Sequence, residues 1–391
     1  MILNNNNRIT FGSFLAYFVM SAVISPLGVV SAPIAEHFGI AITTANAAFT
    51  WLTSGVFIGT LIAVFIFDYL GLKKIVAGGA AIICLCIASI YFFDSFRLFT
   101  LALSIIGVSC GIELSAAAVV IAKLYDAKLR ASMLLLTDSF YSIAGVISTL
   151  LAGVLLARQV HWSSAYLLAF VVTFAIAAIA LSARYPLTRS QTTAQGTQSA
   201  REWSRWPASV HTIGLAMLVY LVGFVTIYSW VPNYAQQYLA VDAETASEVV
   251  SRLFLGMFVG QLVMFVLVLK FSLRVLVLLY ASMATVLTIF LWKVGAGMQL
   301  EVAMLVLGLV TGGLFKTVLT YGTTAVAEPS AKMVSYLIFY AGLGTAIAPF
   351  VSSMVVEQYS MPGVLKFATL CYLAMLILLV ISSKLSASNA P

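Results

Sequence analysis

Twelve long apolar stretches constrain the fold of this chain more than any other feature of its sequence. Each is long enough for a helix to cross the ~30 Å hydrocarbon core of a bilayer, which takes about 20 residues. Their hydrophobicity is unbroken rather than alternating, which excludes a transmembrane β-barrel and predicts an all-α membrane protein of twelve transmembrane helices. The stretches lie at residues 9–35, 44–67, 75–93, 97–123, 132–158, 163–184, 210–239, 247–270, 275–293, 299–326, 332–357 and 362–384.

The composition excludes a soluble enzyme or a nucleic-acid-binding protein. Hydrophobic residues make up 62% of the chain and charged residues 8%, whereas soluble domains carry roughly 25% charged residues. The net charge of +7 does not come from a basic patch interleaved with aromatic residues, so the expected partner is the lipid bilayer. The four cysteines lie in apolar stretches without neighbouring histidines, so we expect no metal, disulfide or other cofactor.

A polar segment at 185–209 divides the chain into two halves of six stretches each, 1–184 and 210–391. Its Ser, Thr and Gln content is typical of a linker. The fourth stretch of each half contains a Gly-x-x-x-Gly sequence, at 107–111 and at 308–312. Such pairs of small residues let helices approach closely. Their recurrence predicts two six-helix bundles built from parallel repeats, joined by a central loop.

The basic residues predict the orientation of the chain. Of the 20 Lys and Arg residues, fourteen fall on the side of the N-terminus, five fall on the other side and Lys316 lies within a stretch. Cytoplasmic loops carry the excess of Lys and Arg. We therefore expect a multi-pass protein of the inner (plasma) membrane with both termini and the central loop in the cytoplasm.

The turn after the second stretch contains Asp68, Gly71, Lys73 and Lys74. This acid, glycine and basic pair resembles the loop motif of the major facilitator family of transporters, with Tyr69 where that family has an arginine. The resemblance implies a secondary transporter that works by alternating access. It also implies that the four matching residues take part in gating, although charges that only set the topology are the alternative.

The segments 136–145 and 228–234 are similar to the TsgA-type branch of this family, which is related to fucose-permease-like proton symporters. The resemblance implies a monomer that couples the transport of a solute to the transport of protons. It does not extend to sugar specificity, because this chain lacks the acid that fucose-permease-like proteins place in their first helix. No nucleotide-binding loop occurs, so an ion gradient is the expected energy source.

Three ionisable residues lie at membrane depth, where they are costly and mark functional sites. Glu113 and Lys316 lie near the middle of the fourth and tenth stretches, and Asp138 lies about two turns into the fifth. We expect Glu113 to exchange a proton, Lys316 to bind an anion, and Asp138 to bind a proton or anchor a gate. Glu113 and Lys316 follow the glycines Gly111 and Gly312 at different offsets, so direct pairing stays open, and a pair that only rigidifies the bundle is the alternative.

Polar and aromatic residues are expected to complete a central binding cavity. The seventh stretch carries several of them around Pro232, where we expect a broken helix that exposes backbone groups. Besides Lys316 and Glu113, the predicted solute-binding residues are Tyr17, Tyr228, Asn233, Gln237, Thr320 and Tyr340.

These features favour a secondary transporter of a small polar solute, anionic or zwitterionic because of Lys316, by proton-coupled symport. An exporter of a metabolite or a citrate-type siderophore is the alternative transport function. A transporter-like solute sensor is the alternative of another class. An enzyme is not expected, because the sequence offers no catalytic constellation of His, Glu and Cys.

Overall fold

The computed structural model describes residues 4–125, 127–185, 206–295, 298–325 and 331–388, which are helical almost throughout. The helices are α1 (Asn5–Ile24), α2 (Leu27–Phe38), α3 (Ile42–Ala47), α4 (Phe49–Tyr69), α5 (Leu72–Phe92), α6 (Phe96–Leu124), α7 (Ala127–Ala157), η1 (Trp162–Tyr166), α8 (Leu167–Ser182), α10 (Ala208–Tyr238), α11 (Ala243–Val268), α12 (Leu273–Phe290), α13 (Met298–Thr311), α14 (Leu314–Thr323) and α15 (Ala331–Ser388).

The twelve predicted spans are confirmed within the described residues. Eleven helical stretches are long and apolar enough to cross a membrane. The longest, Met333–Leu385, counts as two spans, because Ser360 in α15 has a φ of 63° that interrupts the helix. Four spans consist of two consecutive helices each: α1 with α2, α3 with α4, η1 with α8, and α13 with α14.

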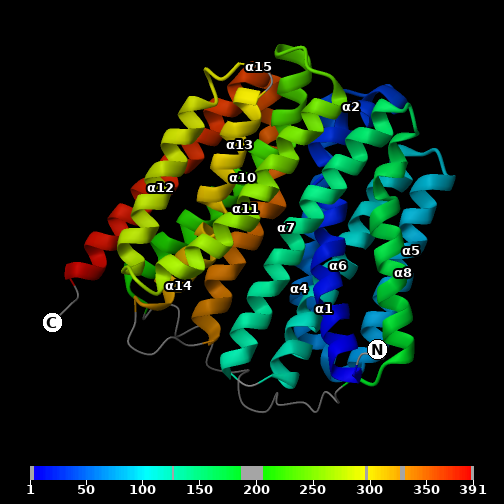
Figure 1. The fold of residues 1–391 in the computed structure, drawn as a ribbon, viewed down its shortest axis with the longest axis horizontal. Coiled ribbons are helices and arrows are strands. Elements are labelled where there is room, and N and C mark those ends of the chain that lie inside the picture. Colours follow the sequence, from blue (N-terminus) through cyan, green and yellow to red (C-terminus); the bar gives the residue numbers. More distant parts are fainter. Residues whose placement is uncertain (1–3, 126, 186–205, 296–297, 326–330, 389–391) are drawn as a thin grey trace.

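The helices form two bundles that lie side by side, α1–α8 and α10–α15 (Figure 1). We call the end of the molecule where Asn5 and Ser388 lie the terminal face. The opposite end, where α7 and α10 finish at Ala157 and Tyr238, is the distal face. The predicted central loop, 185–209, lies mostly outside the described residues, so its exact limits stay a prediction.

The two bundles repeat the same glycine contact. In the first, an added Cβ at Gly107 of α6 would lie 3.0 Å from the Cα of Gly55 in α4 and would collide with Leu52 O. In the second, an added Cβ at Gly256 of α11 would lie 3.0 Å from the Cα of Gly308 in α13. Small residues at matching positions therefore hold the second and fourth spans of each half backbone to backbone.

The break that we expected at Pro232 is wrong, because α10 runs unbroken from Ala208 to Tyr238. Proline removes the hydrogen bond to the carbonyl four residues earlier, here that of Tyr228. Gly28 of α2 approaches this carbonyl so closely that an added Cβ would lie 2.6 Å from the oxygens of Tyr228 and Ser229. The proline thus marks a contact between the bundles rather than a helix end.

Uncharged hydrogen bonds join the bundles toward the distal face. Asn233 Nδ2 of α10 donates to Ser31 Oγ of α2 at 3.0 Å. Asn46 Nδ2 of α3 donates to Ser353 Oγ of α15 at 3.1 Å. All four side chains are buried. The distal part of the interface between the bundles is therefore closely packed.

Candidate functional site

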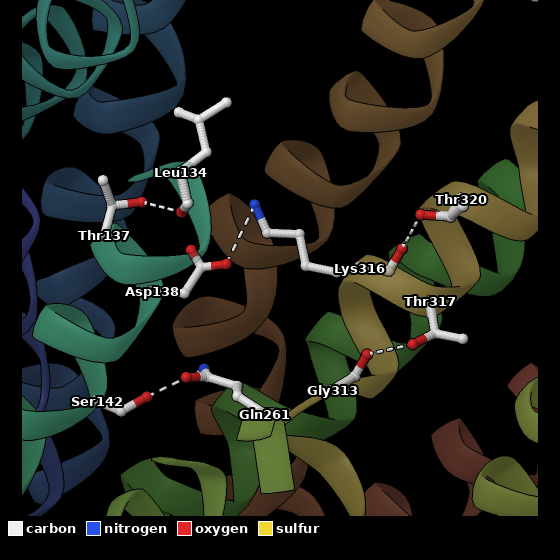
Figure 2. A network of polar contacts seen from close by, with 9 residues as sticks. All are labelled: Leu134, Thr137, Asp138, Ser142, Gln261, Gly313, Lys316, Thr317 and Thr320. Atoms are coloured by element: carbon white, nitrogen blue, oxygen red, sulfur yellow. Dashed lines mark hydrogen bonds and ion pairs between the residues drawn. The ribbon is translucent and has the colours of Figure 1, made fainter. Parts of the chain in front are cut away.

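An ion pair joins the two bundles near the middle of the molecule. Lys316 Nζ of α14 lies 3.3 Å from Asp138 Oδ2 of α7, and Figure 2 shows the two side chains pointing toward one another across the gap between their helices. The Lys316 side chain is 47% exposed and that of Asp138 is 21% exposed. The ammonium group is thus accessible while the carboxylate is mostly enclosed.

A break in the tenth span positions Lys316. The helix is interrupted at Gly312 and Gly313, because consecutive glycines are poor helix formers, and α14 restarts at Leu314. Thr317 Oγ1 then donates to Gly313 O at 2.7 Å. Lys316 consequently lies in the first turn of a short helix that faces α7 (Figure 2).

Groups from α1 and α7 surround the carboxylate of Asp138. Thr137 Oγ1 donates to Leu134 O at 2.6 Å. Tyr17 of α1 and Tyr141 of α7 both lie near enough to Asp138 to interact with it electrostatically. Asp138 therefore has polar neighbours from its own bundle and a cation from the other bundle.

The ion pair lines a cavity of about 480 Å³ between α7, α11, α12 and α14. This volume falls in the range of about 300–1,000 Å³ that is typical of small-molecule sites. The cavity lies in the half of the molecule nearer the terminal face, since it reaches the end of α11 and the start of α12. Its lining residues are Leu136, Asp138, Ser139, Gln261, Leu262, Met264, Phe265, Val268, Leu269, Leu273, Gly312, Gly313, Lys316, Thr317 and Thr320.

Contacts between α7 and α11 close the cavity on its distal side. Gln261 Nε2 donates to Ser142 Oγ at 3.1 Å, one helical turn beyond Asp138 (Figure 2). One turn further, the ring of Phe254 packs on Gly145, where an added Cβ would collide with it. The interface is therefore sealed from this level toward the distal face.

Glu113 lies elsewhere. Its side chain on α6 is 2% exposed and points into the N-terminal bundle, where an added Cβ at Gly79 of α5 would lie 2.7 Å from its Oε1. Among the described residues Oε1 has no hydrogen-bond partner. The cavity that Lys316 lines does not include Glu113, so the structure does not bring these two residues together.

Helix geometry explains the separation of Glu113 and Lys316. Each residue follows a glycine that packs on a neighbouring helix, Gly111 on α4 and Gly312 on α11. At 3.6 residues per turn, an offset of two residues rotates Glu113 by about 200° from Gly111. Lys316 instead follows the break at Gly312 and Gly313 and lies in the first turn of α14, on the side of α7. Glu113 and Lys316 therefore lie at similar depth in the membrane without lining the same cavity.

The other predicted solute-binding residues fall in different places. Thr320 lines the cavity, and its hydroxyl donates to Lys316 O at 2.8 Å. Tyr228 and Asn233 are buried in the distal contact between the bundles, and Gln237 is exposed at the distal end of α10. Tyr340 accepts a hydrogen bond from Tyr336 Oη at 3.2 Å within the C-terminal bundle. Their binding roles stay predictions.

The loop-motif residues lie at the terminal face of the N-terminal bundle. Lys73 Nζ donates to Leu181 O at 2.8 Å and to Ala183 O at 3.3 Å, so it ties the start of α5 to the end of α8. Lys74 is exposed. Gly71 precedes α5 in an extended conformation.

Asp68 lies in the last turn of α4, and its side chain lies outside what the structure describes. Every described contact of the motif is thus within one bundle. Its predicted part in gating stays a prediction.

Sequence reasoning missed Gln261, its partner Ser142 and the break at Gly312. A signal was present, because a polar amide in an apolar span is costly unless it has a partner. Within the described residues, no group of three His, Cys, Asp or Glu side chains is placed to hold a metal ion.

The relatives of this chain agree with the fold. A Protein TsgA homolog of Yersinia pestis is 28% identical over 378 residues, which cover 96% of this chain and 95% of the relative. The solved structure of a bacterial homolog of the human lysosomal transporter Spinster has a TM-score of 0.72 at 14% identity, covering 99% of this chain and 97% of that one. A D-xylose–proton symporter has a TM-score of 0.73 at 13% identity, covering 95% and 96%.

The family model with the description Major Facilitator Superfamily matches residues 9–238, which is more than half of the chain. Its match covers the N-terminal bundle and the whole of α10. The chain is therefore a multi-pass membrane transporter rather than an enzyme, and it belongs to the Major Facilitator Superfamily.

Proposed function

We propose that this protein moves a small organic anion together with a proton across the inner membrane by alternating access. The observation that supports the proposal most is the Lys316–Asp138 ion pair, which spans the two bundles at a cavity of suitable volume. An ionisable residue at membrane depth marks a solute or ion pathway by default. Here two such residues of opposite charge meet where the bundles must separate.

The pair suggests how solute and proton are coupled. A solute carboxylate that binds Lys316 competes with Asp138 for the same ammonium group. A carboxylate that loses its cation in a poorly solvated site favours its neutral form, so Asp138 takes up a proton as the anion binds. The loaded site then carries one anion and one proton. Release of the anion restores the ion pair and expels the proton.

The orientation of this cycle follows from the basic residues. With both termini in the cytoplasm, the cavity near the terminal face opens inward and the packed distal face is the closed outer gate. Asn233, Tyr228 and Gly28 then act as gate contacts rather than as solute ligands. Neutral hydrogen bonds suit such a gate, because each contributes only about 0.5–1.5 kcal/mol net and can be broken in every cycle.

The roles of the remaining candidates follow from their positions. Tyr17 and Thr320 flank the ion pair and orient Asp138 and the solute. Lys73 joins α5 to α8 and keeps the N-terminal bundle rigid while the bundles rock. Glu113, which lies inside that bundle, contributes to its packing and not to the solute site.

Transport by proteoliposomes tests the proposal. A thermal-shift screen of labelled carboxylates, amino acids and sugars first identifies a solute, since a ligand of the folded state raises apparent stability. We expect Lys316→Ala to abolish both counterflow and proton-driven accumulation. Asp138→Asn should keep counterflow and lose the response to a pH gradient. Lys384→Ala, an exposed lysine near the terminal end of α15 that does not line the cavity, is the matched control.

Normal accumulation by both variants would contradict the proposal. The same vesicles with the pH gradient reversed separate uptake from export of a metabolite. Saturable binding without counterflow in the wild-type protein would instead identify a solute sensor.

A further inference from the structure

The cavity beside Lys316 is apolar apart from a few side chains, most of which already have partners. Thr317 Oγ1 and Thr320 Oγ1 donate to carbonyls of their own helix. Gln261 Nε2 donates to Ser142, which leaves Gln261 Oε1 as a buried acceptor without a partner among the described residues. A solute covered with hydroxyl groups would find few free donors here, and burying polar groups without partners is costly. The wall therefore matches a solute that is itself largely apolar.

The apolar wall is a stripe along α11. Leu262, Phe265 and Leu269 stand at positions i, i+3 and i+7, which lie on one face of a helix. They are 54%, 53% and 75% exposed, and all three line the cavity. Over seven residues the stripe extends about 10 Å at 1.5 Å per residue. It begins beside Gln261, one helical turn beyond Asp138 on the distal side, and continues past the ion pair toward the terminal face.

We propose that the solute is an amphipathic organic anion whose charged group binds Lys316 and whose apolar body lies along Leu262, Phe265 and Leu269. This inference rests on the proposed function and specifies its substrate class. A compact polar anion would contact Lys316 but would make no contact with Leu262, Phe265 and Leu269. A cavity of about 480 Å³ has room for both parts of an amphipathic molecule.

Lipid chains are the competing occupant, because exposed apolar residues of a membrane helix ordinarily face lipid. The ion pair distinguishes the two. A charged side chain at membrane depth is costly, and on a surface that contacts only lipid chains nothing offsets this cost. Such charges are therefore rare on lipid-facing surfaces. An occupant whose binding depends on Lys316 is therefore an anion, and an occupant whose binding does not depend on Lys316 is a lipid chain.

The test uses Leu136→Cys as a reporter in lipid nanodiscs, because a detergent would compete for the stripe; Leu136 lines the cavity and is 41% exposed. Methane-, butane- and hexanesulfonate are the probes, since they stay ionised and differ only in their apolar part. Each is titrated for protection of the new thiol from a charged maleimide. The four native cysteines are half-buried or buried and do not line the cavity, and their labelling in the unsubstituted protein is subtracted.

We expect the half-protecting concentration to fall by up to about fourfold for each methylene buried on the stripe, which corresponds to about 0.8 kcal/mol. In the reporter background, Phe265→Asn should flatten this dependence on chain length and leave protection by methanesulfonate unchanged. The adjacent Val266→Asn is the matched control, because Val266 is 48% exposed but does not line the cavity. Lys316→Met should remove protection by all three probes.

Three results would overturn the inference, and they have different consequences for the proposed function. Equal protection by all three probes means a compact polar solute, so the inference fails and the proposed function stands. A chain-length dependence that persists in Lys316→Met means a lipid groove. Efficient labelling that no probe slows, even in the reporter alone, means that Lys316 binds no anion and removes the basis of the proposed function itself.

Discussion

The two carboxylates that were singled out at membrane depth, Asp138 and Glu113, have different surroundings. Asp138 lies at the interface between the bundles and lines the cavity, and its Oδ2 is 3.3 Å from Lys316 Nζ. Glu113 is buried within one bundle, and its Oε1 has no hydrogen-bond partner among the described residues. Both are unusual residues at membrane depth, but only Asp138 has a partner that moves relative to it when the bundles rock.

This comparison shows that depth in the membrane identifies candidate functional residues but does not assign a role to each residue. A charge whose partner belongs to the other bundle is changed by every conformational cycle. A charge enclosed by its own bundle keeps the same neighbours throughout. We therefore expect substitutions at Asp138 to change transport and substitutions around Glu113 to change stability.

The largest effect is expected from breaking the ion pair. Lys316→Ala should reduce transport to background, and Asp138→Ala should abolish proton-driven accumulation. For stability, the double variant should be less destabilised than the sum of the single variants, with a coupling energy of about 1 kcal/mol because Lys316 is half-exposed. A double-mutant cycle of unfolding in mixed micelles measures this. Strict additivity would mean that the pair contributes nothing.

A methyl group beside Glu113 should have the next largest effect. An added Cβ at Gly79 would lie 2.7 Å from Glu113 Oε1, so Gly79→Ala overpacks the bundle and should cost about 1–3 kcal/mol. The neighbouring Gly78→Ala meets open space and should be neutral or stabilising. Thermal unfolding of the two variants checks this. Equal stability of both would show that Glu113 is free to move.

Neutralising Glu113 should change transport much less than breaking the ion pair. Glu113→Gln keeps the shape of the side chain, and the structure gives the carboxyl no ionic partner among the described residues. We expect proton-driven accumulation to stay within about twofold of wild type, which is about 0.4 kcal/mol. Loss of the response to a pH gradient would assign the proton to Glu113 and remove the distinction between the two carboxylates.

The smallest effect concerns His161, which directly precedes the span Trp162–Ser182. Partial burial and the neighbouring His37 lower the pKa of His161, against an opposing effect of Asp94. A lowered pKa of the folded state means that this contribution to stability is present above about pH 6.5 and is lost as the pH falls through the folded pKa.

His161→Gln should therefore reduce the drop in melting temperature between about pH 7.5 and about pH 5.5 and leave transport unchanged. Because this group is mostly exposed, the difference should be small. A larger drop in the variant would show that the charged form of His161 is the favoured one in the folded protein.

Much of the fold could be predicted because lipid restricts the choices. An apolar stretch of about 20 residues in a bilayer has to form a helix, so twelve spans followed from hydrophobicity alone. The sequences 107–111 and 308–312 revealed the repeat, because only small residues allow such close contact. The sequence predicts continuous spans where the structure has breaks at Pro26 and Gly313, and it predicts a break in α10 where the helix is continuous. Proline and glycine indicate where a helix is easily interrupted, but they do not show whether packing with neighbouring helices keeps it intact.

The sequence by itself determined which residues are exceptional: Asp138 and Lys316 were identified because charge in an apolar span is costly wherever it points. Only the tertiary structure decided that they meet, that Glu113 does not, and that Gln261 and Phe265 border the same cavity. The physical reason is rotation about helix axes. A turn of 100° per residue moves a side chain from a cavity to the interior of a bundle at constant depth, and that rotation is fixed by packing with helices far away in the chain.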